Sequence, residues 1–261
     1  MSSRSSSPKP EPGGERVQKV LARTGLASRR EIDRLILSGR VVIDGRPAVP
    51  GDRLTGSERV RIDGRLIRLP GPAQAQQVLA CHKQVGQVTA RRDPEGRPTV
   101  FDELPRPRAG RWIVIGRLDI NTSGLLLFTT DGELAHRMMH PRYEIEREYA
   151  VRIRGELNDA QISLLLAGIE LEDGPARFEF LQPGGGGKSN SWYQVGLREG
   201  KNREVRRLFE ALGVSVSRLI RTRYGPVSLG RMQRGSHREL DAAEIRQLEA
   251  AVGLPGNGVS A

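Results

Sequence analysis

Residues 116–131 read GRLDINTSGLLLFTTD, a polar turn followed by an apolar strand. An apolar run over 112–115 precedes the turn, and the apolar pattern resumes over 125–130 before an Asp-Gly pair ends it. Asp119 lies in the turn, next to the polar residues 121–123. An Asp before polar residues is common in turns that join two strands. Spacing alone therefore favours a structural turn, and the surrounding pattern predicts a pair of strands.

Strand-like and helix-like segments alternate over the rest of residues 78–252 without a regular repeat. Alternating apolar residues predict strands over 149–153 and 192–197. Helices are expected from Asn158 to Leu166 and over 202–212, where Gly213 ends the second. Several strand pairs are joined without a crossover helix, which favours antiparallel pairing. The sequence predicts an α+β fold with a mixed, mainly antiparallel sheet and flanking helices.

Residues 15–67 predict a separate small α/β module. Apolar residues at helical spacing open it, and Ser28 with Glu31 has the spacing of a capping box at the start of a second helix. Two short β-branched runs then lead to Asp44-Gly45 and Asp63-Gly64, which are tight-hairpin signals. The module is therefore expected to contain two short helices and a few short strands.

The order helix, GLASRREIDRLILSGRVVIDG, hairpin resembles the RNA-binding module first named for a ribosomal protein of the small subunit. The resemblance covers residues 15 to about 62 and implies that the second helix faces RNA phosphates. An ordinary solvated helix face is the alternative interpretation of the charges. The basic residues on or beside these helices are Arg23, Arg29, Arg30, Arg34 and Arg40.

Composition separates two tails and a linker from the folded parts of the chain. We expect disordered tails over 1–14 and 253–261, which hold mostly Ser, Pro, Gly and charged residues, and a linker over 68–77. The module over 15–67 and the larger domain over 78–252 remain as the folded parts.

The overall charge favours a nucleic-acid partner. The chain has 42 Lys and Arg against 31 Asp and Glu, a net charge of +11. One cysteine, Cys81, excludes an intramolecular disulfide framework and points to a reducing compartment. The apolar runs are shorter than the roughly 20 residues of a membrane-spanning helix. With no secretory signal at the N-terminus, we expect a cytoplasmic protein without a membrane partner.

Other catalytic motifs do not fit. His136 and His140 are four residues apart, but Arg137 stands where a zinc-protease helix carries Glu, so no metal site is expected. The GGGGKS run over 184–189 lacks the first Gly of a phosphate-binding loop and is expected to be a flexible surface loop. Ser123 lacks the pattern of a hydrolase nucleophile elbow.

The stretch GRLDINTSGLLLFTTDG resembles the signature of RNA pseudouridine synthases, in which GRLDxxTSGLLL carries the catalytic aspartate. The likeness continues through HPRYEIEREYAVRI, LREGKNREVRRLFEALG and VSRLIRTRYGP. Together with the N-terminal module, residues 15–252 are similar to the RsuA/RluB family, most of all to its RluB-type branch, which modifies large-subunit ribosomal RNA.

This resemblance implies three roles. Asp119 corresponds to the catalytic carboxylate, Tyr149 to a tyrosine that packs on the target base, and Arg206 to a basic residue that pairs with the aspartate. A guanidinium beside a buried carboxylate favours the charged form. Further RNA contacts are expected at Arg23, Arg29, Arg30, Arg34, Arg117, Lys201, Arg203, Arg207, Arg221 and Arg223.

The implied enzyme is an isomerase that converts a flipped-out uridine of ribosomal RNA to pseudouridine without a cofactor or metal. Asp119 acts either as nucleophile or as base, and the residues do not choose between these roles. We expect a monomer that binds ribosomal RNA or a ribosomal-subunit precursor. The same chemistry on small-subunit or transfer RNA, and a non-catalytic RNA-binding assembly factor, are the alternatives.

Overall fold

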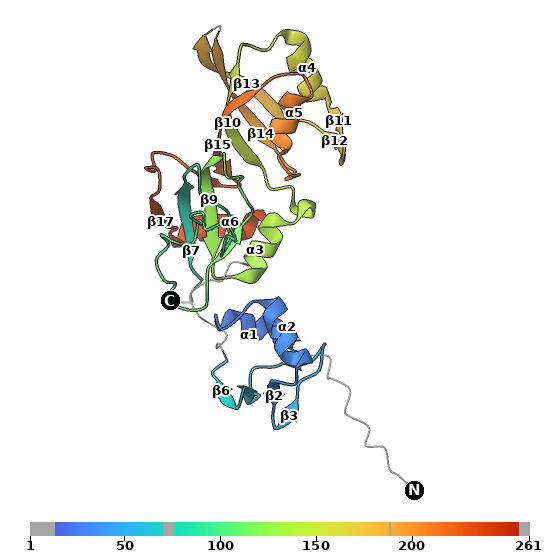
Figure 1. Cartoon of the computed structure of the whole chain (residues 1–261), viewed down its shortest axis with the longest axis vertical. Helices are drawn as coiled ribbons and strands as arrows, with labels where there is room; N and C mark the ends of the chain where they lie inside the picture. The colour runs from blue at the N-terminus through green and yellow to red at the C-terminus, as the bar shows by residue number, and fades with distance from the viewer. Residues whose placement is uncertain (1–13, 70–75, 188, 256–261) are drawn as a thin grey trace. The chain divides into compact units, whose positions relative to one another are not determined.

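The computed structural model describes residues 14–69, 76–187 and 189–255 (Figure 1). Most of the two expected tails and of the expected linker lies outside the described residues. The chain divides into two compact units, 1–76 with 106–112, and 77–105 with 113–261. The short segment 106–112 thus belongs to the N-terminal unit, although the expected boundaries place it in the larger domain. A Cβ on Gly25 would lie 2.6 Å from the carbonyl oxygen of Gly110, which shows how closely this segment packs.

The N-terminal unit has two helices against a small sheet. Ser28 accepts a hydrogen bond from the backbone N–H of Glu31 at 3.1 Å, and the Glu31 carboxylate pairs with Arg34, so half of the expected capping box forms. Its four-stranded sheet has the order β3-β2-β5-β6, and β1 pairs with β4. The elements are β1 (Glu15–Arg16), α1 (Val17–Arg23), α2 (Arg29–Leu37), β2 (Val41–Ile43), β3 (Arg46–Pro47), β4 (Arg53–Leu54), β5 (Val60–Ile62) and β6 (Arg65–Ile67).

Both Asp-Gly pairs close hairpins. Asp44 and Asp63 have φ of 48° and 51°, and the glycine after each also has a positive φ. Positive φ at both central residues is what a tight hairpin turn requires, and Asp tolerates it better than most residues. These turns place β2 against β3 and β5 against β6.

The larger unit is built on a nine-stranded sheet of order β13-β14-β10-β15-β9-β7-β17, with β16 paired to β15 and β8 to β9. Its pairs are antiparallel except β9 with β15, so the expected mixed, mainly antiparallel sheet is confirmed. The strands are β7 (Val78–Lys83), β8 (Ile113–Ile115), β9 (Ser123–Thr129), β10 (Arg147–Arg154), β13 (Phe180–Gly187), β14 (Asn190–Leu197), β15 (Val216–Tyr224), β16 (Val227–Ser228) and β17 (His237–Glu239).

Helices cover this sheet in two groups (Figure 1). One buried apolar cluster joins β7 and β9 to α3 and α6, and a second joins β10 and β14 to α4 and α5. Asn158 begins α4 with a complete capping box. The remaining elements are α3 (Gly132–Met139), the 3₁₀ turn η1 (Pro141–Tyr143), α4 (Asp159–Ala167), the hairpin strands β11 (Ile169–Leu171) and β12 (Gly174–Ala176), α5 (Glu204–Glu210) and α6 (Ala242–Ala251).

The glycine run after residue 183 differs from expectation. Gly184, Gly185, Gly186 and Gly187 continue β13 against β14, with an irregular register between Pro183 and Gly186. A composition of glycine predicts flexibility, but pairing with the adjacent strand satisfies the backbone groups here.

Candidate active site

Asp119 lies in a turn that a buried lysine holds in place. Lys83, at the end of β7, is 0% exposed, and its ammonium donates to the carbonyl oxygens of Gln84, Asp119 and Thr122 at 2.9, 3.0 and 2.8 Å. The backbone N–H of Thr122 donates to the Asp119 carbonyl at 3.0 Å and closes the turn. One side chain thus fixes both ends of the 119–122 segment.

A second set of contacts holds the same turn from the segment after β7. The Thr89 hydroxyl donates to the Leu118 carbonyl at 2.7 Å, and the backbone N–H of Gly86 donates to the Ile120 carbonyl at 2.8 Å. The residues before and after Asp119 are therefore both anchored. Such fixed positioning is what a catalytic carboxylate needs.

Asp119 and Tyr149 line one cavity of about 1270 Å³. This exceeds the roughly 300–1,000 Å³ of typical small-molecule sites. Tyr149 is on β10, where its cross-strand partners are Val195 and Arg221. Eight basic side chains from several elements share the wall with five acidic ones, so the cavity suits an anionic ligand, and Tyr149 adds an aromatic ring to the lining. The lining cations are Arg117, Arg142, Arg147, Arg177, Arg198, Lys201, Arg203 and Arg221.

Two buried arginines and a tyrosine form part of the cavity wall. Tyr224 is 0% exposed, and the guanidinium carbons of Arg147 and Arg221 lie 4.9 and 4.8 Å from its ring centroid. Arg147 donates to the carbonyls of Arg198 and Glu199, and the Tyr224 hydroxyl donates to the Met138 carbonyl at 2.9 Å. The cluster joins β10 and β15 to α3 and to the loop before α5.

Arg206 does not form the expected ion pair with Asp119 in the described structure. Its Nη1 and Nη2 donate to the carbonyl oxygens of Val216 and Asn121 at 3.1 and 3.0 Å, and the side chain is 8% exposed. Burial lowers the pKa of Arg206, and the neighbouring Asp119 carboxylate opposes that shift. Arg206 therefore interacts electrostatically with Asp119 and holds Asn121, two residues farther along the turn.

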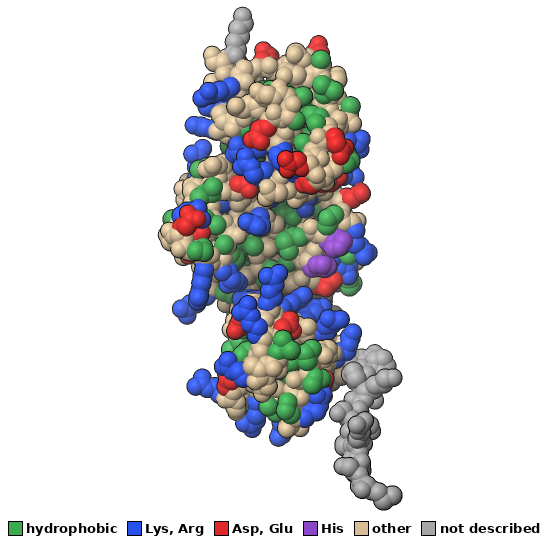
Figure 2. All heavy atoms as spheres, turned by 45° about the vertical axis from the view of Figure 1, so that its right-hand side comes forward, with side chains coloured by type: hydrophobic (Ala, Val, Ile, Leu, Met, Phe, Trp, Pro, Cys, Tyr) green, Lys and Arg blue, Asp and Glu red, His purple; other side chains and the backbone are tan. Residues whose placement is uncertain are grey.

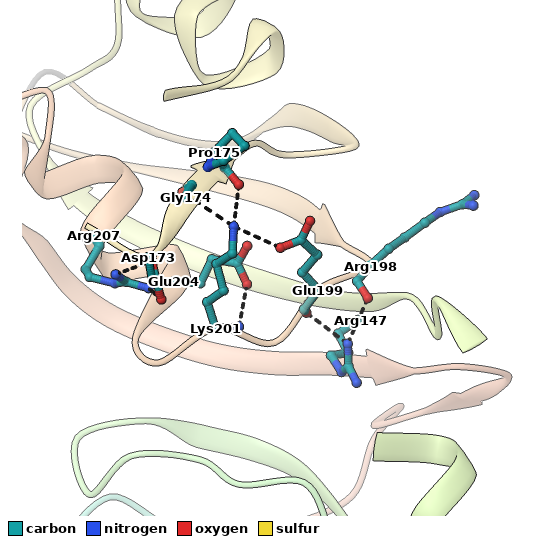
Figure 3. Close-up of polar contacts among 9 residues, drawn as sticks. All are labelled: Arg147, Asp173, Gly174, Pro175, Arg198, Glu199, Lys201, Glu204 and Arg207. Carbon is teal, nitrogen blue, oxygen red and sulfur yellow. Dashed lines mark hydrogen bonds and ion pairs between the residues drawn. The ribbon is translucent and has the colours of Figure 1, made fainter. Parts of the chain in front are cut away.

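The outer rim of the cavity is tied together by lysine and arginine contacts (Figure 3). The Lys201 ammonium donates to the carbonyls of Gly174 and Pro175 and pairs with Glu199 at 3.0 Å. Arg207 pairs with Asp173 through two contacts of 2.7 and 2.8 Å. These contacts fasten the β11–β12 hairpin to α5 and to the loop before it (Figure 3).

Glu204 is buried beside this rim. It is 4% exposed, and its Oε2 accepts a hydrogen bond from the backbone N–H of Lys201 at 3.0 Å. Burial raises the pKa of the Glu204 carboxyl. This contact ties the first residue of α5, the helix that carries Arg206, to the loop that precedes it.

The residues expected to contact RNA fall into three groups. Arg117, Lys201 and Arg203 line the cavity, where Lys201 and Arg203 also pair with Glu199 and Glu210. Arg29 and Arg30 are exposed on α2. The others carry internal contacts. Arg221 is 1% exposed, donates to the Leu125 carbonyl at 2.7 Å and lies in the wall of the cavity. Paired with carboxylates are Arg23, Arg34, Arg207 and Arg223.

Sequence reasoning missed Lys83, Arg147 and Tyr224. The signal for Lys83 was its place at the end of the apolar run 78–83, where a charge is unusual. Arg147 and Tyr224 are both within the matched motifs, but only the fold brings them together.

No cluster of three or more His, Cys, Asp or Glu side chains is arranged to hold a metal ion within residues 14–69, 76–187 and 189–255. In the same ranges, no helix has the length and apolar character needed to cross a membrane.

Comparison with known proteins identifies both units. Residues 77–211 match the family model of RNA pseudouridylate synthases, and residues 15–60 match the S4 domain model. A crystal structure of a pseudouridylate synthase is similar over 89% of this chain and 99% of its own, with a TM-score of 0.61 and 26% identity.

Curated relatives extend the likeness over most of the chain. Ribosomal large subunit pseudouridine synthase B of Escherichia coli strain K12 is 56% identical over 245 residues, which cover 92% of this chain and 84% of the relative. The protein of the same name from Pasteurella multocida is 54% identical over 246 residues, covering 93% and 71%. The resemblance expected from the sequence is confirmed, and the alternative of a non-catalytic factor is set aside. The chain belongs to the RNA pseudouridine synthase family and is an isomerase with an N-terminal S4 domain.

Proposed function

We propose that this enzyme converts a specific uridine of large-subunit ribosomal RNA to pseudouridine, with Asp119 as the catalytic carboxylate and Tyr149 as the residue that stacks on the target base. The observation that supports this most is the joint presence of Asp119 and Tyr149 on one large basic cavity. The relatives of more than 50% identity carry names that specify the large ribosomal subunit.

The reaction breaks the bond between the ribose and N1 of uracil, rotates the base, and joins the ribose to C5. The product has the same atoms as the substrate, and the proton lost from C5 is balanced by one gained at N1. The target base must leave the RNA stack to expose this bond. An aromatic face suits the freed uracil, since base stacking contributes roughly 1–3 kcal/mol per base.

Asp119 is proposed to act on the ribose, as nucleophile or as base. Its anchored turn fixes the backbone from which the carboxylate projects, so less ordering is left for the transition state. Arg206 is proposed to stabilise the ionised carboxylate electrostatically and to hold Asn121, two residues farther along the turn. The exposed arginines of the S4 domain, Arg29 and Arg30, are proposed to bind RNA phosphates.

Asp119→Asn tests this proposal. Cells that lack the gene are complemented with wild type, Asp119→Asn, or the exposed control Asp159→Asn, and pseudouridines are mapped in ribosomal and transfer RNA. We expect wild type and Asp159→Asn to restore a large-subunit site that Asp119→Asn does not restore. The Asp119→Asn protein should still bind the RNA.

The same map separates the alternatives. Loss and restoration confined to small-subunit or transfer RNA would assign the enzyme to that RNA instead. Restoration by Asp119→Asn would remove Asp119 from the chemistry. Comparing free ribosomal RNA with subunit precursors as substrates in vitro then shows which form the enzyme uses.

A further inference from the structure

An exposed aromatic cluster lies where α3 ends. The ring centroids of His136 and His140 are 5.4 Å apart, and those of His140 and Tyr143 are 6.3 Å apart, both in edge-to-face arrangements. Both histidines are exposed, and a neighbouring pair of histidines is visible on the face shown in Figure 2. The whole chain has 4 histidines, so two of them beside a tyrosine at one surface need an explanation.

The cluster adjoins the catalytic cavity. Met139, Pro141, Arg142 and Glu144, interleaved with the rings in the sequence, line the cavity that holds Asp119. Met139 is 40% exposed and adds an apolar surface beside the histidines. A nucleotide bound on these rings would therefore lie next to the nucleotide in the cavity.

A cation without a carboxylate partner accompanies the rings. The Arg142 guanidinium lies 4.9 Å from the Tyr143 ring centroid, and no acidic side chain pairs with it within 4.0 Å among the described residues. Arg137, by contrast, is fixed by Glu133 and by the carbonyls of Val252 and Gly253. Rings beside an available guanidinium match the two parts of a nucleotide, a base and a phosphate.

Two of the rings, those of His140 and Tyr143, are held before any ligand binds. His140 Nδ1 accepts a hydrogen bond from the backbone N–H of Arg142 at 3.2 Å, which orients the imidazole. Tyr143 is half-buried and packs against the core that contains Leu134 and Met138. Side chains already fixed lose little conformational freedom on binding. The backbone contact explains the place of His140, but it leaves His136 and Arg142 without a structural role.

We propose that His136, His140, Tyr143 and Arg142 form a stacking platform for an unpaired nucleotide that adjoins the target uridine in the RNA substrate. This rests on the proposed function, because the cavity must first receive the target uridine. A metal site is the weaker interpretation, since the two histidines have no third Cys, His, Asp or Glu arranged with them in the described chain.

Kinetics with a synthetic RNA fragment that carries the mapped uridine test the platform. The double variant His136→Ala, His140→Asn removes both imidazoles, while Asn keeps an acceptor for the Arg142 N–H. We expect KM to rise about fivefold or more, as the loss of a stacked base predicts, with kcat changed less than about twofold. His140→Phe, which keeps a ring, should retain most of the affinity. His237→Ala, at an exposed histidine outside the cavity lining, is the matched control.

Substrate variants identify the base. A set of fragments has an abasic residue at one position each, on either side of the target. One of these should raise KM for wild type by the same factor as the double variant, and the double variant should not distinguish that fragment from the intact one.

An unchanged KM in the double variant, or abasic effects that add to the variant's effect at every position, would overturn the platform. Wild type that forms no pseudouridine in any RNA would instead mean that the proposed function fails. If wild type is active and the platform variants have the same KM as wild type, only the platform proposal fails.

Discussion

Lys83 carries an ammonium group into the protein interior. Three carbonyl oxygens accept its hydrogen bonds, and the charge of Asp119 lies nearby. Burial nevertheless lowers the pKa of Lys83 from 10.5 to about 8. A buried cation is costly unless such partners are present. Lys83 therefore anchors the turn that bears Asp119, and its three carbonyl partners offset the cost of burying its charge.

Replacing Lys83 tests this balance. Lys83→Met should lower the free energy of unfolding by about 2–4 kcal/mol, because it leaves buried carbonyls without donors. It should also reduce kcat, because the 119–122 turn loses its anchor. Chemical denaturation and single-turnover kinetics measure the two effects. Lys19→Met, at a surface ion pair on α1, should change stability by less than about 1 kcal/mol.

The difference in unfolding free energy between wild type and Lys83→Met should increase with pH. Between pH 8 and 10.5 the unfolded chain holds the Lys83 proton more often than the folded chain, so stability rises with pH. Wild type should therefore gain stability relative to Lys83→Met across this window. A difference that stays constant, or that falls with pH, would contradict the lowered pKa.

Arg206 is expected to position the turn that bears Asp119 through the carbonyl oxygens of Asn121 and Val216. Arg206→Ala should reduce kcat, because both carbonyls lose their donor and the turn loses this contact. Arg206→Lys, which keeps the charge but cannot make both carbonyl contacts, should also reduce kcat, and single-turnover kinetics measure both variants. An Arg206→Ala enzyme with the kcat of wild type would show that these contacts do not position the turn.

At the scale of elements, the site depends on the close parallel pairing of β9 with β15. Gly124 pairs with Arg221 in this parallel ladder, and its φ is 110°. A Cβ there would lie 2.3 and 2.5 Å from the backbone oxygen and nitrogen of Arg221. No side chain can yield at this point, since the obstructing atoms are backbone. The glycine after Ser123 in the motif is thus a requirement of strand packing.

Gly124→Ala should accordingly destabilise the enzyme by about 3 kcal/mol or more, through overlap as well as backbone strain. Gly155→Ala is the matched control, because Gly155 also has a positive φ, 76°, but nothing lies within 4 Å of the added carbon. Thermal and chemical denaturation give the comparison. Equal losses of stability in the two variants would show that backbone strain alone, and not overlap with the backbone of Arg221, accounts for the effect.

The pairing of β9 with β15 also shows which features of the fold local sequence patterns can predict. Local periodicity predicted β9, β10, β14 and α4 to within a few residues, because each has its own apolar pattern or cap. The parallel pairing of Ser123 and Gly124 with Ile220 and Arg221 joins segments far apart in the chain. No local pattern encodes such a pairing, so the wall formed by Arg147, Arg221 and Tyr224 could not be predicted.

For the candidate site, the motif likewise predicted individual residues but not the contacts between them. The motif predicted Asp119 and Tyr149, and the fold places both on one cavity. The expected direct pairing with Arg206 does not occur, because that guanidinium is already bound to two carbonyl oxygens. A motif specifies which residues a family keeps in sequence. The geometry among them depends on backbone contacts that the motif does not describe.

At the scale of the whole molecule, the charge of +11 is only partly available to RNA. Many arginines are engaged in ion pairs, such as Arg40 with Asp63 at 2.6 Å and Arg223 with Glu148. Arg29 and Arg30, on α2, are exposed and have no carboxylate partner within 4.0 Å among the described residues. Net charge therefore overstates the number of phosphate contacts, and unpaired exposed arginines are the better guide to them.

Salt dependence of RNA binding tests this distinction. Each phosphate contact releases counterions, so losing one should reduce the slope of log Kobs against log salt concentration by about 1. The double variant Arg29→Ala, Arg30→Ala should weaken binding of the RNA fragment and lower that slope by about 2. Arg40→Ala, which removes an arginine already paired with Asp63, should lower it less. If Arg40→Ala reduces the slope as much per arginine as the double variant does, ion pairing in the free protein does not decide which arginines meet phosphate.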